Sequence, residues 1–117
     1  MKIVVVGTGY VGLVTGVCLA TRGHDVVCVD KDKNIIKKIN NNIDTIFENY
    51  LANYLNEAIK NKALKADNEL EKNLRGTDIV LICVGAPTEN GEINLTHIIE
   101  SIQSIARWMK KNMNIYQ

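Results

Sequence analysis

A short apolar run at residues 3–6 ends directly in the sequence GTGYVG at positions 7–12, and this junction constrains the fold more than any other feature. The G-x-G-x-x-G spacing is typical of a strand-to-helix turn that holds the pyrophosphate of a dinucleotide. Gly7 permits a tight turn, Gly9 lets backbone amides approach the phosphates, and Gly12 lets the helix pack closely on the strand. The helix N-terminus supplies N–H groups and a partial positive charge. The junction therefore predicts a strand, a phosphate-binding loop and a helix, in that order.

The acid expected of such a motif stands at the end of a second apolar run. The segment 25–30 is apolar and mostly β-branched between its two terminal acids, which is typical of a buried strand. The second acid, Asp30, follows Gly12 by 18 positions. A carboxylate at about this distance accepts hydrogen bonds from the adenosine ribose and repels a 2′-phosphate, which favours NAD over NADP. Asp30 is also suited to cap the next helix. Lys31 and Lys33 weaken the preference for NAD, because an ammonium can accommodate an extra phosphate.

The remaining hydrophobic pattern predicts an alternation of helices and strands. Gly23 is a suitable residue to end the first helix, and the run at residues 79–84 is typical of a third buried strand. The other expected elements are helices over residues 10–21, 35–39, 48–61 and 95–109, and a strand beginning near residue 113. This order predicts an α/β fold with a Rossmann-like, doubly wound parallel sheet that is truncated. Residues 1–117 are expected to form one incomplete dinucleotide-binding domain, with no linker or second domain.

Apolar residues at helical spacing indicate which side of each helix should face the core. The three predicted stripes are Val11, Val14, Cys18 and Thr21; Leu51, Tyr54, Leu55, Ala58 and Ile59; and Leu95, Ile98, Ile99, Ile102, Ile105, Ala106 and Met109. Gly16 adds a second point where the first helix can approach the sheet. The cysteines Cys18, Cys28 and Cys83 are expected to be small buried hydrophobic residues in a reducing cytoplasm.

A second cofactor-binding segment is predicted where the third strand ends. Loops that leave the carboxyl ends of strands line the ligand crevice of a doubly wound sheet, and this loop carries the only proline of the chain. By position alone, an ordinary strand-to-helix turn explains the segment equally well. The complete set of predicted cofactor-binding residues is Gly7, Gly9, Tyr10, Val11, Gly12, Asp30, Val84, Gly85, Ala86 and Pro87.

Composition argues against several classes of function. A formal net charge of +1, with lysines scattered among acids, gives no basic stripe for nucleic acid. No run of 18 apolar residues is present, which argues against a membrane-spanning helix, and the chain begins in a strand pattern rather than a signal peptide. Without a C-x-x-C motif or a cysteine–histidine cluster, we predict no metal site. His24 and His97 lack a neighbouring acidic pattern that suggests a relay, and we expect no catalytic residue in this chain.

Three blocks of sequence resemble one enzyme family. They are GTGYVGLVTG at positions 7–16, GHDVVCVD at 23–30, and VGAP at 84–87 followed by Asn90-Gly91 and Asn94-Leu95. Together they resemble the UDP-glucose/GDP-mannose dehydrogenase family, and within it the enzymes that act on UDP-glucose. The resemblance covers essentially the whole chain. It implies the NAD-binding Rossmann domain of a cytoplasmic oxidoreductase of nucleotide-sugar metabolism and polysaccharide biosynthesis.

The resemblance also implies a reaction. Members of the family oxidise the C6 alcohol of a nucleotide sugar to a carboxylate by two hydride transfers to NAD, using a cysteine nucleophile assisted by lysine and aspartate. Those residues belong to sequence after Gln117, and none of Cys18, Cys28 and Cys83 matches the motif of the catalytic cysteine. The chain alone is therefore expected to bind NAD without catalysis, and to meet UDP-glucose only when the missing domain is supplied. Full-length relatives are expected to be homo-oligomers.

Three departures from the family pattern fall in or near the predicted site. Ala86 stands where the family has a threonine, so a hydroxyl able to bond the cofactor is lost. Ile35 replaces a lysine five residues after the ribose-binding acid. Residues 45–51 read TIFENYL where the family has PIYEPGL, and the loss of both prolines and the glycine predicts a reshaped turn or a longer helix.

Other functions are compatible with parts of this pattern. The chain alone would serve as a non-catalytic NAD-binding module. A hydroxyacid or sugar-phosphate dehydrogenase would share the Rossmann start, but the block at residues 10–16 argues against it. A fragment of a related UDP-sugar or GDP-mannose dehydrogenase is a nearer alternative, because substrate contacts in such enzymes lie mainly outside this region.

Overall fold

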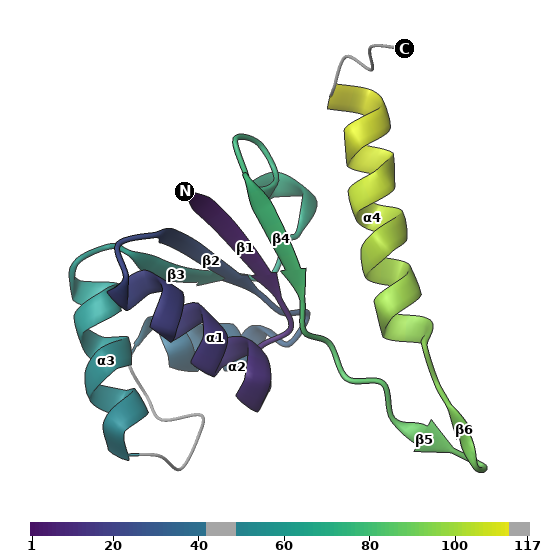
Figure 1. Cartoon of the computed structure of the whole chain (residues 1–117), viewed down its shortest axis with the longest axis horizontal. Helices are drawn as coiled ribbons and strands as arrows, with labels where there is room; N and C mark the ends of the chain where they lie inside the picture. The colour runs from purple at the N-terminus through teal and green to yellow at the C-terminus, as the bar shows by residue number, and fades with distance from the viewer. Residues whose placement is uncertain (42–48, 113–117) are drawn as a thin grey trace.

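A four-stranded parallel sheet forms the centre of the computed structural model, which describes residues 1–41 and 49–112. The strands are β1 (Lys2–Val6), β2 (Asp25–Val29), β3 (Leu64–Asp67) and β4 (Ile79–Ile82), and their order in space is β3-β2-β1-β4 (Figure 1). All neighbours pair in parallel. This order is that of the first strands of a doubly wound dinucleotide-binding fold, and the expected α/β Rossmann-like class is confirmed.

The helices cover the two faces of the sheet unequally. One face packs against α1 (Tyr10–Thr21), α2 (Lys33–Asn40) and α3 (Asn49–Lys60). The other face packs against the segment around Leu70, which leads into the single-turn helix η1 (Glu71–Asn73). The last helix, α4 (Thr96–Asn112), touches η1 and stands beside β4 rather than over the sheet (Figure 1). The larger core therefore lies between the sheet and the first three helices.

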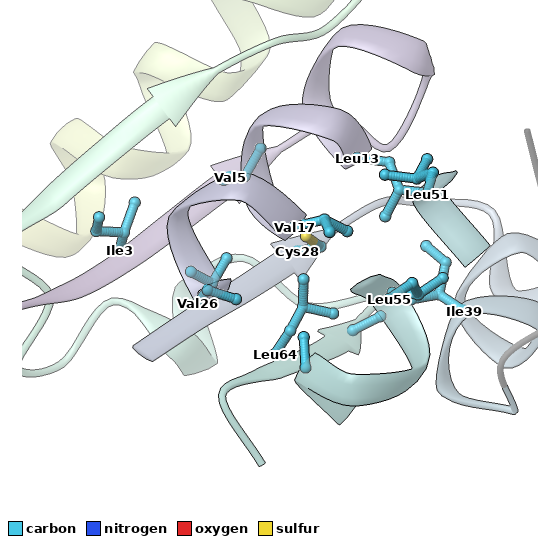
Figure 2. Packing of buried hydrophobic residues seen from close by; sticks show 13 residues of the cluster. Ile3, Val5, Leu13, Val17, Val26, Cys28, Ile39, Leu51, Leu55 and Leu64 are labelled. Carbon is cyan, nitrogen blue, oxygen red and sulfur yellow. The ribbon is translucent and has the colours of Figure 1, made fainter. Parts of the chain in front are cut away.

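Alternation along β1 and β2 fills both sides of the sheet. Val4 and Val27 belong to the smaller core on one face, whereas Val5 and Cys28 belong to the larger core on the other face, and all four are fully buried. Strands that are buried on both faces are continuously apolar, which is the pattern that predicted them. Figure 2 shows the larger core, where side chains from α1, α2 and α3 converge on β1, β2 and β3. Its members are Ile3, Val5, Leu13, Val17, Ala20, Val26, Cys28, Ile39, Leu51, Leu55, Ala58, Leu64 and Ala66.

The predicted buried face of α1 is wrong, although both bounds of the helix are as expected. Leu13, Val17 and Ala20 face the core, while Val11 is 65% exposed and Cys18 and Thr21 are exposed. The sequence of this helix is apolar on nearly every side, so periodicity alone does not select a face. Cys18 is therefore not the buried hydrophobic residue we expected. Cys28 is buried, and Cys83 is half-buried.

Strand β3, the single-turn helix η1 and a β-hairpin were not predicted. Strand β3 contains only two apolar residues in four, and it is held by parallel pairing with β2. The hairpin consists of two short strands, β5 (Thr88–Glu89) and β6 (Glu92–Ile93), joined by Asn90 and Gly91. Both turn residues have positive φ, 51° and 80°, which is the Asn-Gly signature of a two-residue hairpin. The sequence did carry that signal.

The apolar stripes of the later helices are buried to different extents. In α3, Leu51, Leu55 and Ala58 are buried as predicted, but Tyr54 is 52% exposed. In α4 the stripe lies mostly open, with Leu95, Ile99, Ile102 and Met109 exposed and Ser101 buried instead. The amphipathic pattern predicted a helix correctly and its orientation incorrectly. The expected helix start at residue 48, the changed residues 45–48 and the strand expected near residue 113 lie outside the described residues.

Asn40, the last residue of α2, is bound to the edge strand β3. Its side-chain amide donates to the backbone oxygen of Ala66 at 2.9 Å and accepts from the backbone N–H of Ala66 at 2.9 Å. The amide group thus takes the place of a neighbouring strand at this position. Edge strands need such protection, because their unpaired backbone groups otherwise recruit other chains.

We expect Asn40→Ala to lower the free energy of unfolding by about 1–3 kcal/mol, since two backbone groups lose their partner. Asn41→Ala is the matched control, because among the described residues the side chain of Asn41, the C-cap of α2, bonds the carbonyl of Lys37 and does not touch β3. Urea denaturation of both variants measures the difference. Equal stability of the two variants would show that the hydrogen bonds between the Asn40 side chain and Ala66 do not stabilise β3.

Candidate dinucleotide-binding site

A cavity of about 660 Å³ opens at the carboxyl ends of the parallel strands. The loop after β1, the end of β2 and the residues after β4 form three of its sides, and α4 forms a fourth. Ligands of doubly wound sheets bind at this edge, where the order of strands reverses between β1 and β4. The volume is within the range of small-molecule and cofactor sites. The fold thus places the cavity where the sequence predicted the cofactor.

The glycine loop is packed too tightly for side chains at two of its three glycines. Gly7 has a φ of 99°, and a Cβ there would lie 2.8 Å from the backbone carbon of Cys83. A Cβ at Gly12 would overlap the carbonyl oxygen of Gly7. A Cβ at Gly9, by contrast, would meet no protein atom within 4 Å. The fold itself therefore requires Gly7 and Gly12, whereas Gly9 borders open space and is not required by packing.

The first turn of α1 faces this loop without a side-chain cap. Its N-cap is Gly9, which has no side chain to bond the first amide groups, and the first turn contains no acidic residue. A helix N-terminus in this state attracts an anion through its N–H groups and its dipole. This arrangement suits the pyrophosphate expected from the motif.

Asp30 lies at the end of β2 and lines the cavity together with the loop. Its Oδ2 accepts hydrogen bonds from the backbone N–H of Thr8 at 2.9 Å and from the Thr8 hydroxyl at 2.6 Å. Its Oδ1 accepts from the backbone N–H of Asp32 at 2.9 Å. Partial burial by itself raises the pKa of the Asp30 carboxyl, but these hydrogen bonds outweigh burial and hold the pKa below its ordinary value. Asp30 is therefore a carboxylate at neutral pH.

The alternative role considered for Asp30, capping α2, belongs to its neighbour. Asp32 is the N-cap, and its Oδ1 accepts from the backbone N–H groups of Asn34 at 2.9 Å and Ile35 at 3.4 Å. Asp30 instead accepts a hydrogen bond from the backbone N–H of Asp32, just before the helix begins. Asp32 therefore supplies the cap of α2, and Asp30 is not needed for it although it lines the cavity.

The structure brings five of the ten predicted cofactor-binding residues to the cavity wall and leaves five outside it. Lining the cavity are Gly7, Gly9, Asp30, Val84 and Gly85. Gly12 is buried beneath the loop, where it sets the position of the helix. The other four, Tyr10, Val11, Ala86 and Pro87, are exposed and lie within two positions of a wall residue in the sequence. For all ten, contact with a cofactor stays a prediction.

Sequence reasoning missed two walls of the cavity. Residues 68–72 supply one of them and carry no recognisable motif. The polar side of α4 supplies the other through His97, Glu100, Ser101 and Ser104. An amphipathic helix is expected to turn its polar side to water, so the pattern gave no sign that this side faces a site.

Lys31 is bound to α4 across the mouth of the cavity. Its Nζ lies 2.8 Å from Glu100 Oε2, and this hydrogen-bonded ion pair lowers the pKa of the Glu100 carboxyl. Lys31 was considered a group that could accept the 2′-phosphate of NADP. With Glu100 beside it, the charge of Lys31 is balanced. Lys33 lies in the first turn of α2 and does not line the cavity.

Two departures from the family pattern have structural consequences. Ile35 packs against the larger core instead of presenting a charge, so the replaced lysine is not compensated at that position. Ala86 is exposed just beyond Gly85 and offers no hydroxyl. Within residues 1–41 and 49–112, no helix is long and apolar enough to cross a membrane, and no three candidate side chains gather as a metal site.

The parallel sheet, the glycine loop at an uncapped helix start and the acid at the end of β2 together define a dinucleotide-binding domain of the Rossmann class. A family model described as the NAD binding domain of the UDP-glucose/GDP-mannose dehydrogenase family matches residues 1–116. The chain belongs to this family. The NAD expected from Asp30 agrees with that description.

Known relatives support the assignment and extend beyond this chain. It is 37% identical over 113 residues to a UDP-glucose 6-dehydrogenase of Rickettsia bellii, covering 96% of this chain and 26% of the relative. It is 36% identical over 117 residues to a UDP-glucose 6-dehydrogenase of Bacillus subtilis, covering 99% of this chain and 24% of the relative. The chain thus spans about a quarter of the length of these relatives.

Solved structures of dehydrogenases share the fold. A GDP-mannose dehydrogenase from Pseudomonas aeruginosa, solved as a ternary complex, aligns with a TM-score of 0.93 and 31% identity over 97% of this chain and 26% of its own. A UDP-glucose dehydrogenase from Pyrobaculum islandicum aligns with a TM-score of 0.87 and 28% identity over 94% of this chain and 26% of its own. Enzymes for different sugars therefore carry this same domain.

Proposed function

We propose that residues 1–117 are the NAD-binding part of a nucleotide-sugar dehydrogenase. The observation that carries the proposal is the pairing of an open, uncapped phosphate loop with an ionised acid at one cavity. In this arrangement the amides from Gly9 to Gly12 bind the pyrophosphate, and Asp30 accepts from the adenosine ribose. Bound NAD would supply the hydride acceptor. The chain itself contributes binding and orientation of that group.

We infer UDP-glucose as the sugar of the whole enzyme, because the sequence relatives named above act on it by name. GDP-mannose is the second candidate, supported by the close structural match to a GDP-mannose dehydrogenase. The proposal places the chain in the cytoplasm, which agrees with three cysteines that form no disulfide in the described residues. Homo-oligomers of the whole enzyme remain part of the proposal.

The first test is binding of NADH to the folded chain, measured by titration calorimetry. Asp30→Ala should weaken binding by about 1.5–3 kcal/mol, or roughly 10- to 150-fold, because charged hydrogen bonds to the ribose are lost. Asp25→Ala is the matched control, since Asp25 is an exposed acid at the opposite end of the same strand. Equal affinity of the two variants would remove Asp30 from the site. A folded wild-type chain that binds no NADH would overturn the proposal itself.

The second test concerns NADPH, which should bind more weakly than NADH because the Asp30 carboxylate opposes a 2′-phosphate. Glu100→Gln should raise the affinity for NADPH relative to NADH by about 2- to 5-fold at low salt, since it releases Lys31 from an exposed ion pair. Glu89→Gln removes the same charge from the β5–β6 hairpin and controls for net charge. High salt should abolish the difference. An NADPH affinity equal to that for NADH in the wild-type chain would show that the lysines set the preference.

The third test is turnover, and we expect these 117 residues not to oxidise UDP-glucose when supplied with NAD. Holding the sugar carbon against the nicotinamide contributes roughly 7–11 kcal/mol to such a reaction. The chain spans only a quarter of its relatives, and we assign that task to the remaining three quarters. Formation of NADH is followed by absorbance. Turnover that disappears in Cys83→Ser, which alters a cavity residue, but persists in Cys18→Ser would place an active site in this chain.

A further inference from the structure

Thr8 is the one polar side chain that the glycine loop buries. It occupies the variable position between Gly7 and Gly9, and only 3% of its surface is exposed. A buried hydroxyl without a partner is costly, so the identity of its partner matters. That partner is Asp30, 22 residues later in sequence, at 2.6 Å from the hydroxyl oxygen to Oδ2.

The hydrogen bonds of Asp30 can be counted against its capacity. An ionised carboxylate has about four acceptor positions, two on each oxygen. On Oδ2 both are taken, by the backbone N–H and the hydroxyl of Thr8. On Oδ1 one is taken by the backbone N–H of Asp32. The backbone N–H of Lys31 also interacts with the carboxylate and helps to lower its pKa. The three bonds given above place two donors on Oδ2 and one on Oδ1, so Oδ1 is the less occupied oxygen.

We propose that Thr8 is a positioning residue, which holds the Asp30 carboxylate by Oδ2 so that Oδ1 is the oxygen that accepts from the ribose. The inference rests on the proposed function, because it concerns the same cofactor site. It adds a link between the phosphate loop and the acid. The side chain that orients the acid belongs to the loop that binds the pyrophosphate, so the two halves of the site are held in one geometry.

Electrostatics agrees with this arrangement. The hydroxyl of Thr8 contributes to holding the pKa of the Asp30 carboxyl below its ordinary value. Besides Asp30, the ionisable groups around the cavity are Lys31, Glu69, Glu71, Lys72, Cys83, His97 and Glu100, with Asp32 two positions further in sequence and Asp67 at the end of β3. Acids outnumber lysines in this set, so the surrounding charge does not by itself keep Asp30 ionised. Local hydrogen bonds have that role.

The test compares Thr8→Val, which keeps the shape and removes the hydroxyl, with Thr8→Ser, which keeps the hydroxyl. In the ligand-free chain, NMR titration of the Asp30 carboxyl carbon should show a higher pKa in Thr8→Val than in wild type. Thr8→Ser should restore the lower value. NADH should bind several-fold more weakly to Thr8→Val at pH 7, and close to normally to Thr8→Ser.

A double-mutant cycle separates positioning from mere stability. In the Asp30→Asn background, Thr8→Val should cause little further loss of NADH affinity, because the group it positions is gone. An equal loss in both backgrounds, or an unchanged Asp30 pKa in Thr8→Val, would overturn the inference. If Thr8→Val does not fold, Thr8→Ala takes its place, since it also removes the hydroxyl and is smaller; an Asp30 pKa unchanged in Thr8→Ala would equally overturn the inference. Absence of NADH binding in wild type would instead refute the proposed function, while the NMR results would still decide the role of Thr8.

Discussion

The close contact between the glycine loop, the end of β4 and the start of α1 is the constraint on which the rest of the structure depends. Gly7 donates its N–H to the carbonyl of Val29 at 2.8 Å, and Cys83 donates to the carbonyl of Val6 at 2.7 Å. The end of β1 is thereby bonded on both sides. Because the atoms that crowd Gly7 and Gly12 are mainly backbone, no side-chain rearrangement could accommodate larger residues. These contacts thus hold β1 between β2 and β4, set α1 against the loop and define this side of the cavity.

The sequence predicted those parts of the fold that local chemistry determines. The bounds of α1 were correct because a glycine motif opens the helix and Gly23, with a φ of 93°, follows its end. The buried face of the same helix was wrong, because Val11 and Leu13 are equally apolar and only the sheet distinguishes them. Strand β3 was missed for a similar reason. Its backbone partners are Val26–Val29 and the Asn40 side chain, which a local pattern of four residues cannot reveal.

The candidate site likewise contains residues that the sequence could predict and residues that only the tertiary structure reveals. Gly7, Gly9 and Asp30 could be predicted at the cavity because the motif requires backbone geometry and charge at fixed spacing. Thr8 was passed over, since the motif leaves its position unspecified and its partner becomes visible only when β1 and β2 lie side by side. The wall contributed by α4 could not be predicted without the tertiary structure. Its residues line a cavity only because the helix turns its polar side inward.

The orientation of α4 makes it the wall of the site that is easiest to displace. Ordinary burial would bring its isoleucines inward, yet Ile99 and Ile102 are about half exposed in the described structure. What holds the helix to the body includes its contact with η1 and two ion pairs, Lys31–Glu100 at 2.8 Å and Arg107–Glu71 at 4.0 Å. All four of these side chains are substantially exposed, and such pairs contribute at most about 1 kcal/mol each. The phosphate loop, in contrast, is fixed by buried backbone. Of the two walls, the phosphate loop is therefore held by the stronger interactions, and the α4 wall by contacts that salt and single substitutions can weaken.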